Sequence, residues 1–440
     1  MMKMNHTSLS AILLGMLMLG RMEAQERRLT IEECLALGIE RSRTLHASVM
    51  KAEYADAKAA EVAAALYPSL RLQAGYARLS DVPEFRIPIP GNSITFPVIL
   101  DTYSSRLSLQ QPLFAGGRLR GAANQAAYHA DAARYDVSKD KAELMLAMKT
   151  AYWNLYRARA FRQVSDENVA VLTAHVTDAE NLLKQGMLTP NDLLKVKVQL
   201  SNAMLMQSEA GNRVQLAMVS LNSLIGLPLG TTIIPASSLT MTTKEFPGID
   251  SLLSVALDER PEVLGMEMRV RAAEAGVTSA RGGWFPQVSL TGNYYYSRPN
   301  QRIFPALDEF RETWDVGISL QFDLWNNLTT KHQTGAAGAQ HEQTKDALET
   351  LKDGITLEVT QGALSVRQAQ QRIRLAELGV EQAAESYRMT ADKFKSGLST
   401  NSDLLDAEIA LIQSKLQMTD ALVEYELAQA RLEKAVGESK

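Results

Sequence analysis

The sequence predicts a mostly α-helical chain with a membrane β-barrel portion, built from two tandem units that each run helix–strand–strand–helix–helix. The first observation is an internal repeat: QGMLTPNDLLKVKVQLSNA (185–203) is similar to SGLSTNSDLLDAEIALIQS (396–414), 211 residues later. The second is a pair of segments in each half where apolar and polar residues alternate. The third is a long helical pattern in each half without a strong breaker. A period of this length is too long for a solenoid repeat and indicates a duplicated domain.

The repeat sets the predicted domain boundaries. Residues 25–226 form the first unit, 227–249 a linker and 250–440 the second unit. Residues 1–24 resemble a secretory signal, with Lys3 before an apolar stretch and cleavage near Ala24; the alternative is a membrane anchor. After residue 24 no run of 18 apolar residues occurs, so no transmembrane helix is expected.

In the first unit, residues 30–66 are expected to form one helix that starts with a capping box of Thr30 and Glu33. Residues 68–78 alternate as a strand, the Pro-rich segment 81–98 is expected to be a loop, and a second strand surrounds Leu107 and Leu109. A long helix follows over 114–185, and a shorter one over 191–226. The second unit repeats this order, with helices at 250–281, 328–395 and 401–437 and strands around 288–296 and 314–322.

The helix lengths and seams predict how the helices pack. Residues 30–66 and 191–226 total 73, close to the 72 of the long helix, so two short helices stacked end to end would match one long helix in a cylinder wall. A heptad seam also follows each short helix. Its members in the two copies are Leu193, Leu200, Gln207, Val214 and Leu221, with Val196, Ala203, Ala210, Ala217 and Leu224; and Leu404, Leu411, Met418, Tyr425 and Leu432, with Ala407, Ser414, Ala421, Ala428 and Ala435.

Composition and motifs argue against several function classes. A formal charge of −4 provides no nucleic-acid-binding footprint, and no GxxxxGK[ST] loop or HExxH pair occurs. The histidines after the signal are expected to be solvated or capping residues, and the methionines to be core filler; the histidines are His46, His129, His175, His332 and His341. The single cysteine, Cys34, is expected to be buried. We therefore expect no enzyme activity, no metal site and no cofactor.

Four strands per chain are too few for a membrane barrel, because the smallest have about eight. Either the strands pack as a small sandwich in water, or several chains share one barrel. Aromatic residues at the strands and their ends favour the shared barrel, since such girdles mark membrane interfaces. They are Tyr76, Tyr103, Trp284, Phe285, Tyr294, Tyr296, Trp314, Phe322 and Trp325. The lipid-facing set would be Leu70, Leu72, Leu107, Leu109, Val288, Leu290, Val316 and Ile318.

Taken together, the chain resembles the TolC-like outer-membrane efflux proteins. The resemblance rests on the duplication, on QPLFAGGR (111–118), on Pro68 and Pro286, and on the two segments GMLTPNDLL and GLSTNSDLLDAE. It implies a homotrimer in which a 12-stranded barrel in the outer membrane of a Gram-negative bacterium continues into an α-helical tunnel across the periplasm. It also implies two protein partners: a periplasmic adaptor (membrane fusion) protein, and an inner-membrane transporter of the RND, ABC or MFS type.

The resemblance assigns roles to the two turns between long and short helices. The turns would dock the adaptor through Gly186, Met187 and Leu188 in the first copy and through Gly397 and Leu398 in the second. The family latch uses a Tyr and an Arg around the second turn, and the matching residues here are Phe394 and Ser399. Asp192 matches the latch carboxylate, and Lys195 or Lys395 is the candidate replacement for the missing cation.

Asp403 and Asp406 lie one helical turn apart just after the second turn, so they share one helix face. The resemblance implies that they form the selectivity ring at the periplasmic aperture. The alternative is a solvated face on which Asp403 stabilises the helix terminus. In the first copy Asp192 keeps the charge and Lys195 reverses it.

The predicted function is a passive outer-membrane exit duct for small molecules, driven by the inner-membrane transporter. Protein export by a type I secretion system would use the same architecture and remains an alternative. A periplasmic coiled-coil protein without a pore is the alternative from another class. The four two-faced strands argue against it, because a spacer does not need them.

Overall fold

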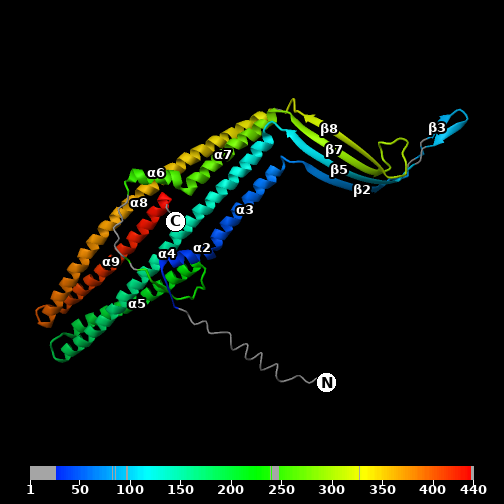
Figure 1. The fold of residues 1–440 in the computed structure, drawn as a ribbon. Coiled ribbons are helices and arrows are strands. Elements are labelled where there is room, and N and C mark those ends of the chain that lie inside the picture. The colour runs from blue at the N-terminus through cyan, green and yellow to red at the C-terminus, as the bar shows by residue number, and fades with distance from the viewer. Residues whose placement is uncertain are drawn as a thin grey trace, which may run out of the picture. The chain divides into compact units, whose positions relative to one another are not determined.

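The computed structural model describes residues 26–437 except 82, 85, 96–97, 238, 240–246 and 327. The signal predicted over 1–24 lies outside these residues. The chain divides into two compact units, whose elements are labelled in Figure 1. The first comprises the chain up to Ala47, Lys139–Arg260 and the chain from Gly354 onward, and the second comprises Ser48–Ser138 and Pro261–Asp353.

The first unit is a helical assembly with one small parallel strand pair. It contains α2 (Ile31–Arg41), α5 (Pro190–Ile225), α6 (Ile249–Glu259), α9 (Asn401–Val436), the C-terminal parts of α4 (Arg118–Lys184) and α8 (Thr329–Lys395), and the pair β1 (Arg27–Leu29) and β6 (Ile233–Pro235). The predicted capping box at Thr30 is present: its hydroxyl accepts from the Glu33 amide at 3.3 Å, and the Glu33 carboxylate accepts from the Thr30 amide at 2.8 Å.

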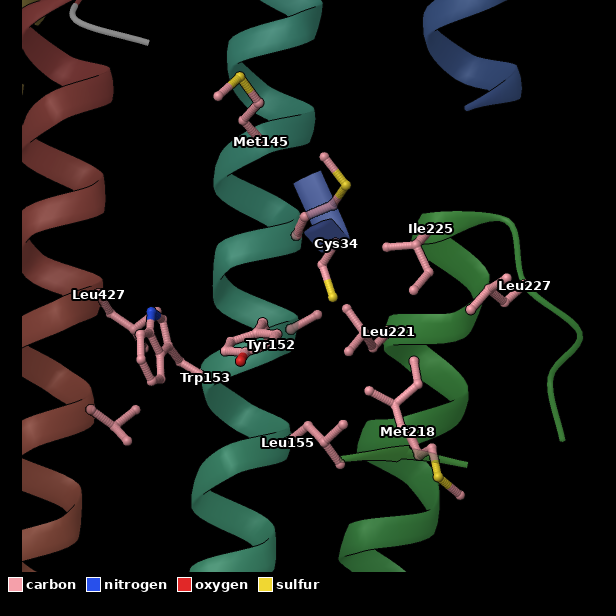
Figure 2. Close-up of a cluster of buried hydrophobic side chains, with 14 residues drawn as sticks. Cys34, Met145, Tyr152, Trp153, Leu155, Met218, Leu221, Ile225, Leu227 and Leu427 are labelled. Carbon is pink, nitrogen blue, oxygen red and sulfur yellow. The ribbon is translucent and has the colours of Figure 1, made fainter. Parts of the chain in front are cut away.

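The core of this unit gathers where α2 and α5 pack on α4 (Figure 2). Tyr152 and Leu155 on α4 meet Leu221 on α5, and Cys34 on α2 points into the same cluster. The Tyr152 hydroxyl donates to the Leu29 carbonyl and accepts from the Ser237 amide, each at 3.0 Å. This buried phenol therefore ties the strand pair to the long helix without an unsatisfied polar group.

The predicted heptad seams are confirmed by burial. On α5 the small or branched residues Val196, Ala203 and Ala210 are almost fully buried, while their i−3 partners are half-buried. On α9 the matching small residues Ser414, Ala421, Ala428 and Ala435 are buried as well. Small side chains at this spacing let helix axes approach closely.

The second unit combines helices with an antiparallel sheet. Its helices are most of α3 (Arg43–Ala64), α7 (Pro261–Arg281), the short η1 (Gly282–Trp284) and the N-terminal parts of α4 and α8. The sheet has the order β2 (Ser69–Arg78), β5 (Asp101–Phe114), β7 (Gln287–Arg298), β8 (Arg311–Gln321). The central β5–β7 pair therefore joins a strand from each half of the sequence.

The QPLFAGGR segment turns β5 into α4, and its glycines explain why. Gly116 and Gly117 have φ of +58° and +86°, which residues with a Cβ rarely adopt. Four residues after Gly117, a Cβ on Gly121 would lie 2.5 Å from the Ser279 amide nitrogen. Glycine is therefore required both for the turn and for the close approach of α4 to α7.

Two predicted helices are each divided in the structure. The expected helix over 30–66 breaks at Ser42, whose backbone is extended and whose hydroxyl accepts from the Leu45 amide at 3.1 Å. The expected helix over 250–281 breaks at Arg260, which is extended because Pro261 follows it. Ser42 and Pro261 thus start new helices that the apolar periodicity alone does not reveal.

The expectation of a loop over 81–98 is also wrong in part. Within it β3 (Arg86–Ile89) pairs with β4 (Asn92–Thr95), and Gly91 at φ +90° allows the tight turn between them. Proline is tolerated in such a hairpin because an edge strand leaves half of its amides unpaired.

Candidate functional site

The four-stranded sheet has one apolar face and one polar face. One cross-strand row is Leu72, Leu107, Tyr294 and Trp314, and the next is Leu70, Leu109, Gly292 and Val316. The predicted lipid-facing residues all belong to this face. Leu70, Leu72, Val316 and Ile318 are each about two-thirds exposed or more, at 66, 69, 66 and 72 %. An apolar face this exposed requires a nonaqueous neighbour.

The opposite face carries a polar network. Arg106 donates to Asn293 at 2.8 Å, Asn293 donates to Asp315 at 2.8 Å, and Arg302 pairs with Asp315 at 2.7 Å. The Tyr295 ring lies beneath the Arg302 guanidinium at 4.4 Å. Serine, threonine and glutamine fill most of the remaining positions of this face. It is therefore suited to contact water.

Aromatic side chains gather near both ends of the strands. At one end Tyr76 contacts Tyr103 at 5.0 Å between ring centres, and Phe310 stacks on Tyr296 at 5.1 Å. At the other end Phe114 contacts Phe285 edge-on at 6.4 Å, beside exposed Trp284. Such a distribution is typical of the two interfaces of a membrane.

The first unit ends in two helical hairpins. The first hairpin is α4–α5 with its turn at residues 185–189, and the second hairpin is α8–α9 with its turn at 396–400 (Figure 1). Both turns close with a left-handed glycine: Gly186 has φ +73° and Gly397 has φ +71°. The Met187 and Leu398 amides each donate back to the carbonyl five residues earlier. The same turn chemistry is thus used twice.

The adaptor-docking residues predicted at these turns differ in exposure. Met187 is 71 % and Leu398 is 79 % exposed. Leu188 was also expected to be exposed, but it is half-buried and packs with Leu193 and Val196. The exposed apolar tip therefore consists of Met187 and Leu398.

Asp192 and Asp403 occupy equivalent helix starts. Asp192 accepts from the Thr189 hydroxyl at 2.6 Å, and its other oxygen lies 3.7 Å from Lys195. Asp403 accepts from the Thr400 amide at 2.9 Å and from the Thr400 hydroxyl at 2.6 Å. Hydrogen bonds from Thr189 and from Thr400 hold the pKa of Asp192 and of Asp403 below their usual range.

Asp403 and Asp406 both remain exposed on α9. Ser399, one of the predicted gate residues, donates to Asp403 at 3.1 Å. The carboxylate of Asp403 therefore serves the helix cap, and Asp406 is the freer of the two. The spacing T-x-x-D in both copies was the sequence signal for this capping role.

Phe394 lines a cavity between the hairpins. The cavity measures about 370 Å³ and is bounded by α4, the first turn, α8 and the start of α9. Leu182 and Leu188 of the first hairpin line it together with Phe394 and Lys395 of the second. Three residues singled out from the sequence, Leu188, Phe394 and Lys395, therefore line one cavity. His175 lines the same cavity.

His175 was expected to be a solvated or capping residue, and this is wrong. Its Nδ1 lies 3.6 Å from Oε2 of Glu408, and the two side chains are 17 % and 7 % exposed. His175 lies between the buried residues Leu172 and Ala179 on α4. Glu408 follows the buried residues Leu404 and Leu405 on α9. A seam traced along α4 at seven-residue spacing would have identified the position.

Comparisons with known proteins settle the family. The family model described as outer membrane efflux protein matches residues 35–227 and 252–438. The chain belongs to the outer membrane efflux protein family. It is accordingly an outer-membrane protein of an export family, and this family consists of channels rather than enzymes.

Individual members of the family cover most of the chain. It is 25 % identical to the alkaline protease secretion protein AprF of Pseudomonas aeruginosa, over 76 % of this chain and 69 % of AprF. It is 23 % identical to the pyoverdine export outer membrane protein OpmQ of the same species, over 92 % of this chain and 83 % of OpmQ.

Solved structures of outer-membrane proteins share the fold. The outer membrane protein VceC of Vibrio cholerae aligns with a TM-score of 0.79 and 18 % identity, covering 92 % of this chain and 96 % of VceC. The MtrE outer membrane channel of Neisseria gonorrhoeae aligns with a TM-score of 0.77 and 18 % identity, covering 92 % of this chain and 88 % of MtrE.

Two further observations hold for the part of the chain that the structure describes. No helix there is long and apolar enough to cross a membrane. No three metal-ligating side chains among the described residues gather as a metal site.

Proposed function

We propose that the protein is the outer-membrane exit duct of a tripartite export system for small molecules. The observation that carries this proposal is the two-faced sheet, with its exposed apolar face and its polar opposite face. Such a sheet can stand in lipid and line water at once. The conduit itself would be passive, and an inner-membrane transporter would supply the energy.

The sheet also supports a shared barrel. Its outer strands are β2 and β8, and no described strand pairs with their free edges. Open edges cannot face lipid, because their backbone groups would remain unsatisfied. Three copies would give twelve strands and close the barrel, so the homotrimer implied by the resemblance satisfies every edge.

The duplication remains part of the proposal. The family model matches twice, over 35–227 and 252–438, which is in keeping with units at 25–226 and 250–440 joined by 227–249. The lengths agree as well, since α4 and α8 each have 67 residues and α5 and α9 each have 36.

The duct is tested by purifying the protein in detergent and inserting it into planar bilayers. Discrete conductance steps and the mass of three chains in the detergent-solubilised protein are expected. A soluble monomer that gives no conductance would contradict the proposal. Export is tested in a strain that lacks the native duct, by measuring the accumulation of a dye.

We place adaptor docking at the exposed tip of Met187 and Leu398. Replacing both with Asp is expected to abolish cysteine crosslinking to the adaptor while leaving bilayer conductance intact. Val171 serves as a control, because it is exposed on α4 outside the turns. If crosslinking and export survive the double change, adaptor docking takes place elsewhere.

The aperture ring is assigned to Asp403 and Asp406, which would give two stacked rings of three carboxylates in a trimer. Rings of carboxylates attract cations. Because Asp403 also serves the helix cap, the suitable test is Asp403→Asn with Asp406→Asn, which keeps an acceptor at the cap. We expect block by multivalent cations on the periplasmic side to disappear. Asp192→Asn is the matched control, and unchanged block in the double variant would overturn the assignment.

Protein secretion is the second candidate, because AprF, whose name denotes protease secretion, aligns over three-quarters of the chain. The two candidates differ in what fails when the gene is deleted. Loss of a secreted protein with unchanged dye efflux would favour secretion, and the converse would favour small-molecule export. A coiled-coil spacer without a pore is disfavoured by the sheet and by the family.

A further inference from the structure

Among the described residues, the contact between the two hairpins near their turns includes a largely buried pair of ionisable groups. His175 on α4 belongs to the first hairpin, and Glu408 on α9 belongs to the second. Beside them lies an apolar cluster, in which Leu172 and Ala179 on α4 pack with Leu405 on α9. Burying ionisable side chains is costly unless they are hydrogen-bonded or paired with each other.

The geometry of the pair is unusual. Nδ1 of His175 and Oε2 of Glu408 are 3.6 Å apart, beyond hydrogen-bond distance, and both atoms are buried without a hydrogen-bond partner in the described structure. A small movement of α4 against α9 would bring them into hydrogen-bond contact. His175 also lines the cavity of about 370 Å³, so its side chain is not enclosed by packing on every side.

We propose that His175 and Glu408 form an inter-hairpin latch, in which one shared proton keeps the buried contact neutral and holds the two hairpins together at the aperture. This inference rests on the proposed function, since it concerns the end of the duct at which the turns lie. It also supplies what the sequence lacks, because Phe394 and Ser399 stand where the family latch has a Tyr and an Arg.

The two groups respond to burial in opposite directions. Burial raises the pKa of Glu408 to about 7, above its ordinary 4.5. Burial lowers the pKa of His175 below its ordinary 6.5, although the nearby Asp178 carboxylate opposes this. With one proton on the pair, neither a lone carboxylate nor a lone imidazolium is buried.

Other charged groups near the pair are few or already paired. On α5 Lys197 pairs with Glu180 at 2.8 Å. On α8 the pKa of Tyr387 is raised by burial and then by the charge of Glu408, so that phenol stays neutral. The other charged residues lining the cavity are Asp178, Arg388, Asp392 and Lys395, and Arg388 pairs with Asp392 at 3.2 Å.

The two opposite pKa shifts give the latch two opposing dependences on pH. Glu408 alone would favour the closed contact below its ordinary pKa of 4.5, and this preference would be lost as pH rises to about 7. His175 alone would favour closure above 6.5, and this preference would be lost as pH falls. Below 6.5 the two contributions oppose each other, so closure of the parent protein should depend on pH less steeply than closure of a variant that keeps only one of the two groups.

Single substitutions should therefore expose opposite pH dependences. In His175→Gln the ratio of closed to open channels is expected to fall as pH rises from 5 to 7, by up to about tenfold per pH unit. In Glu408→Gln the same ratio should fall as pH drops below 6.5, with the same limiting slope. The double variant His175→Gln, Glu408→Gln should show no pH dependence from this site.

The measurement is open probability in planar bilayers at symmetrical pH from 5 to 8. Glu180→Gln is the matched control, because it breaks an exposed ion pair within the first hairpin, and it should behave like the parent. Backbone hydrogen exchange over residues 172–179 gives the same comparison for a variant that does not insert into bilayers.

Slopes of opposite sign in the two single variants, together with a shallower slope in the parent, would establish the latch. A merely structural contact would loosen in both variants without a change in pH dependence, and this result would overturn the proposal. If the parent itself forms no channel, the proposed function fails instead, so the two failures are distinguishable.

Discussion

At Arg260 a charged side chain is almost fully buried at the break between α6 and α7. Its guanidinium lies 2.6 Å from the Glu358 carboxylate and donates to the Ala435 carbonyl at 3.2 Å. Burial works against the charge of Glu358, yet Arg260 and then Lys434 hold the pKa of Glu358 below its usual range. The three groups therefore tie the end of α6 to α8 and to the end of α9.

We expect Arg260→Met to lower the free energy of unfolding by about 2–3 kcal/mol, because hydrogen bonds to a charged group are lost while volume is kept. The contribution of Glu358 should also decline as pH falls through its lowered pKa. Urea unfolding in detergent, followed by circular dichroism, measures both effects. Arg388→Gln is the control, since the Arg388–Glu385 pair is exposed and its loss should be undetectable. An Arg260 variant as stable as this control would contradict the argument.

Cys34 offers a probe of the core shown in Figure 2. Burial raises the pKa of its thiol to about 12, and Glu33 and Glu32 add to the effect. The reactive form is the thiolate, so labelling by a maleimide should be slow in the native protein even at pH 9. Labelling should become fast in urea. Rapid labelling of the native protein would show that the α2–α4 contact opens readily.

At the scale of single elements, the sequence was most informative where a pattern is periodic. Alternation located all four strands of the sheet, and the 3.6-residue pattern located α5, α9 and both long helices. It failed at Ser42 and Arg260, because a helix break there depends on one hydroxyl cap or on the proline that follows. Pro261 could have predicted the break at Arg260. Ser42 could not have been singled out as a cap, because the sequence contains many other serines.

The candidate site was predictable to a similar degree. The glycines of the two turns and the exposed Met187 and Leu398 follow from local turn chemistry. The His175–Glu408 contact does not, because it joins residues 233 positions apart whose meeting depends on how two hairpins pack. Even so, the seven-residue spacing of Leu172 and Ala179 could have indicated that His175 faces inward.

The two faces of β8 provide a direct test of the sheet. Ile318 lies on the apolar face and Ser319, its neighbour, lies on the polar face. We expect Ile318→Arg to destabilise the assembled protein by about 2–4 kcal/mol if the residue lies near the bilayer midplane. Ser319→Arg, the matched change on the other face, should be tolerated. Yield of folded protein in the outer membrane and urea stability measure the difference, and equal effects of the two changes would show that the face does not meet lipid.

At the scale of the whole molecule, the single chain has two kinds of surface that an assembly would cover. The sheet has two free edges among the described strands, and α5 exposes Leu194, Val198, Leu205 and Leu216. At 3.6 residues per turn, these four positions fall within an arc of about 40° on the helix. They therefore form one stripe, which lies apart from the seam of Val196, Ala203 and Ala210 that α5 buries within its own chain.

We predict that this stripe contacts another copy in the proposed trimer. Leu205 and Leu216 are 61 % and 72 % exposed, and replacing both with Glu would place six buried carboxylates in the assembled trimer. Since a carboxylate without a partner is costly to bury, the trimer should dissociate or fail to form. Native mass spectrometry of the detergent-solubilised protein would then show single chains in place of trimers. Gln215→Glu is the matched control, because it adds a carboxylate at an exposed polar position beside the stripe and should leave the trimer intact. If the double variant remains trimeric and as stable as the control, the stripe faces water or another partner, and the contact between copies must be sought on the exposed leucines of α8 instead.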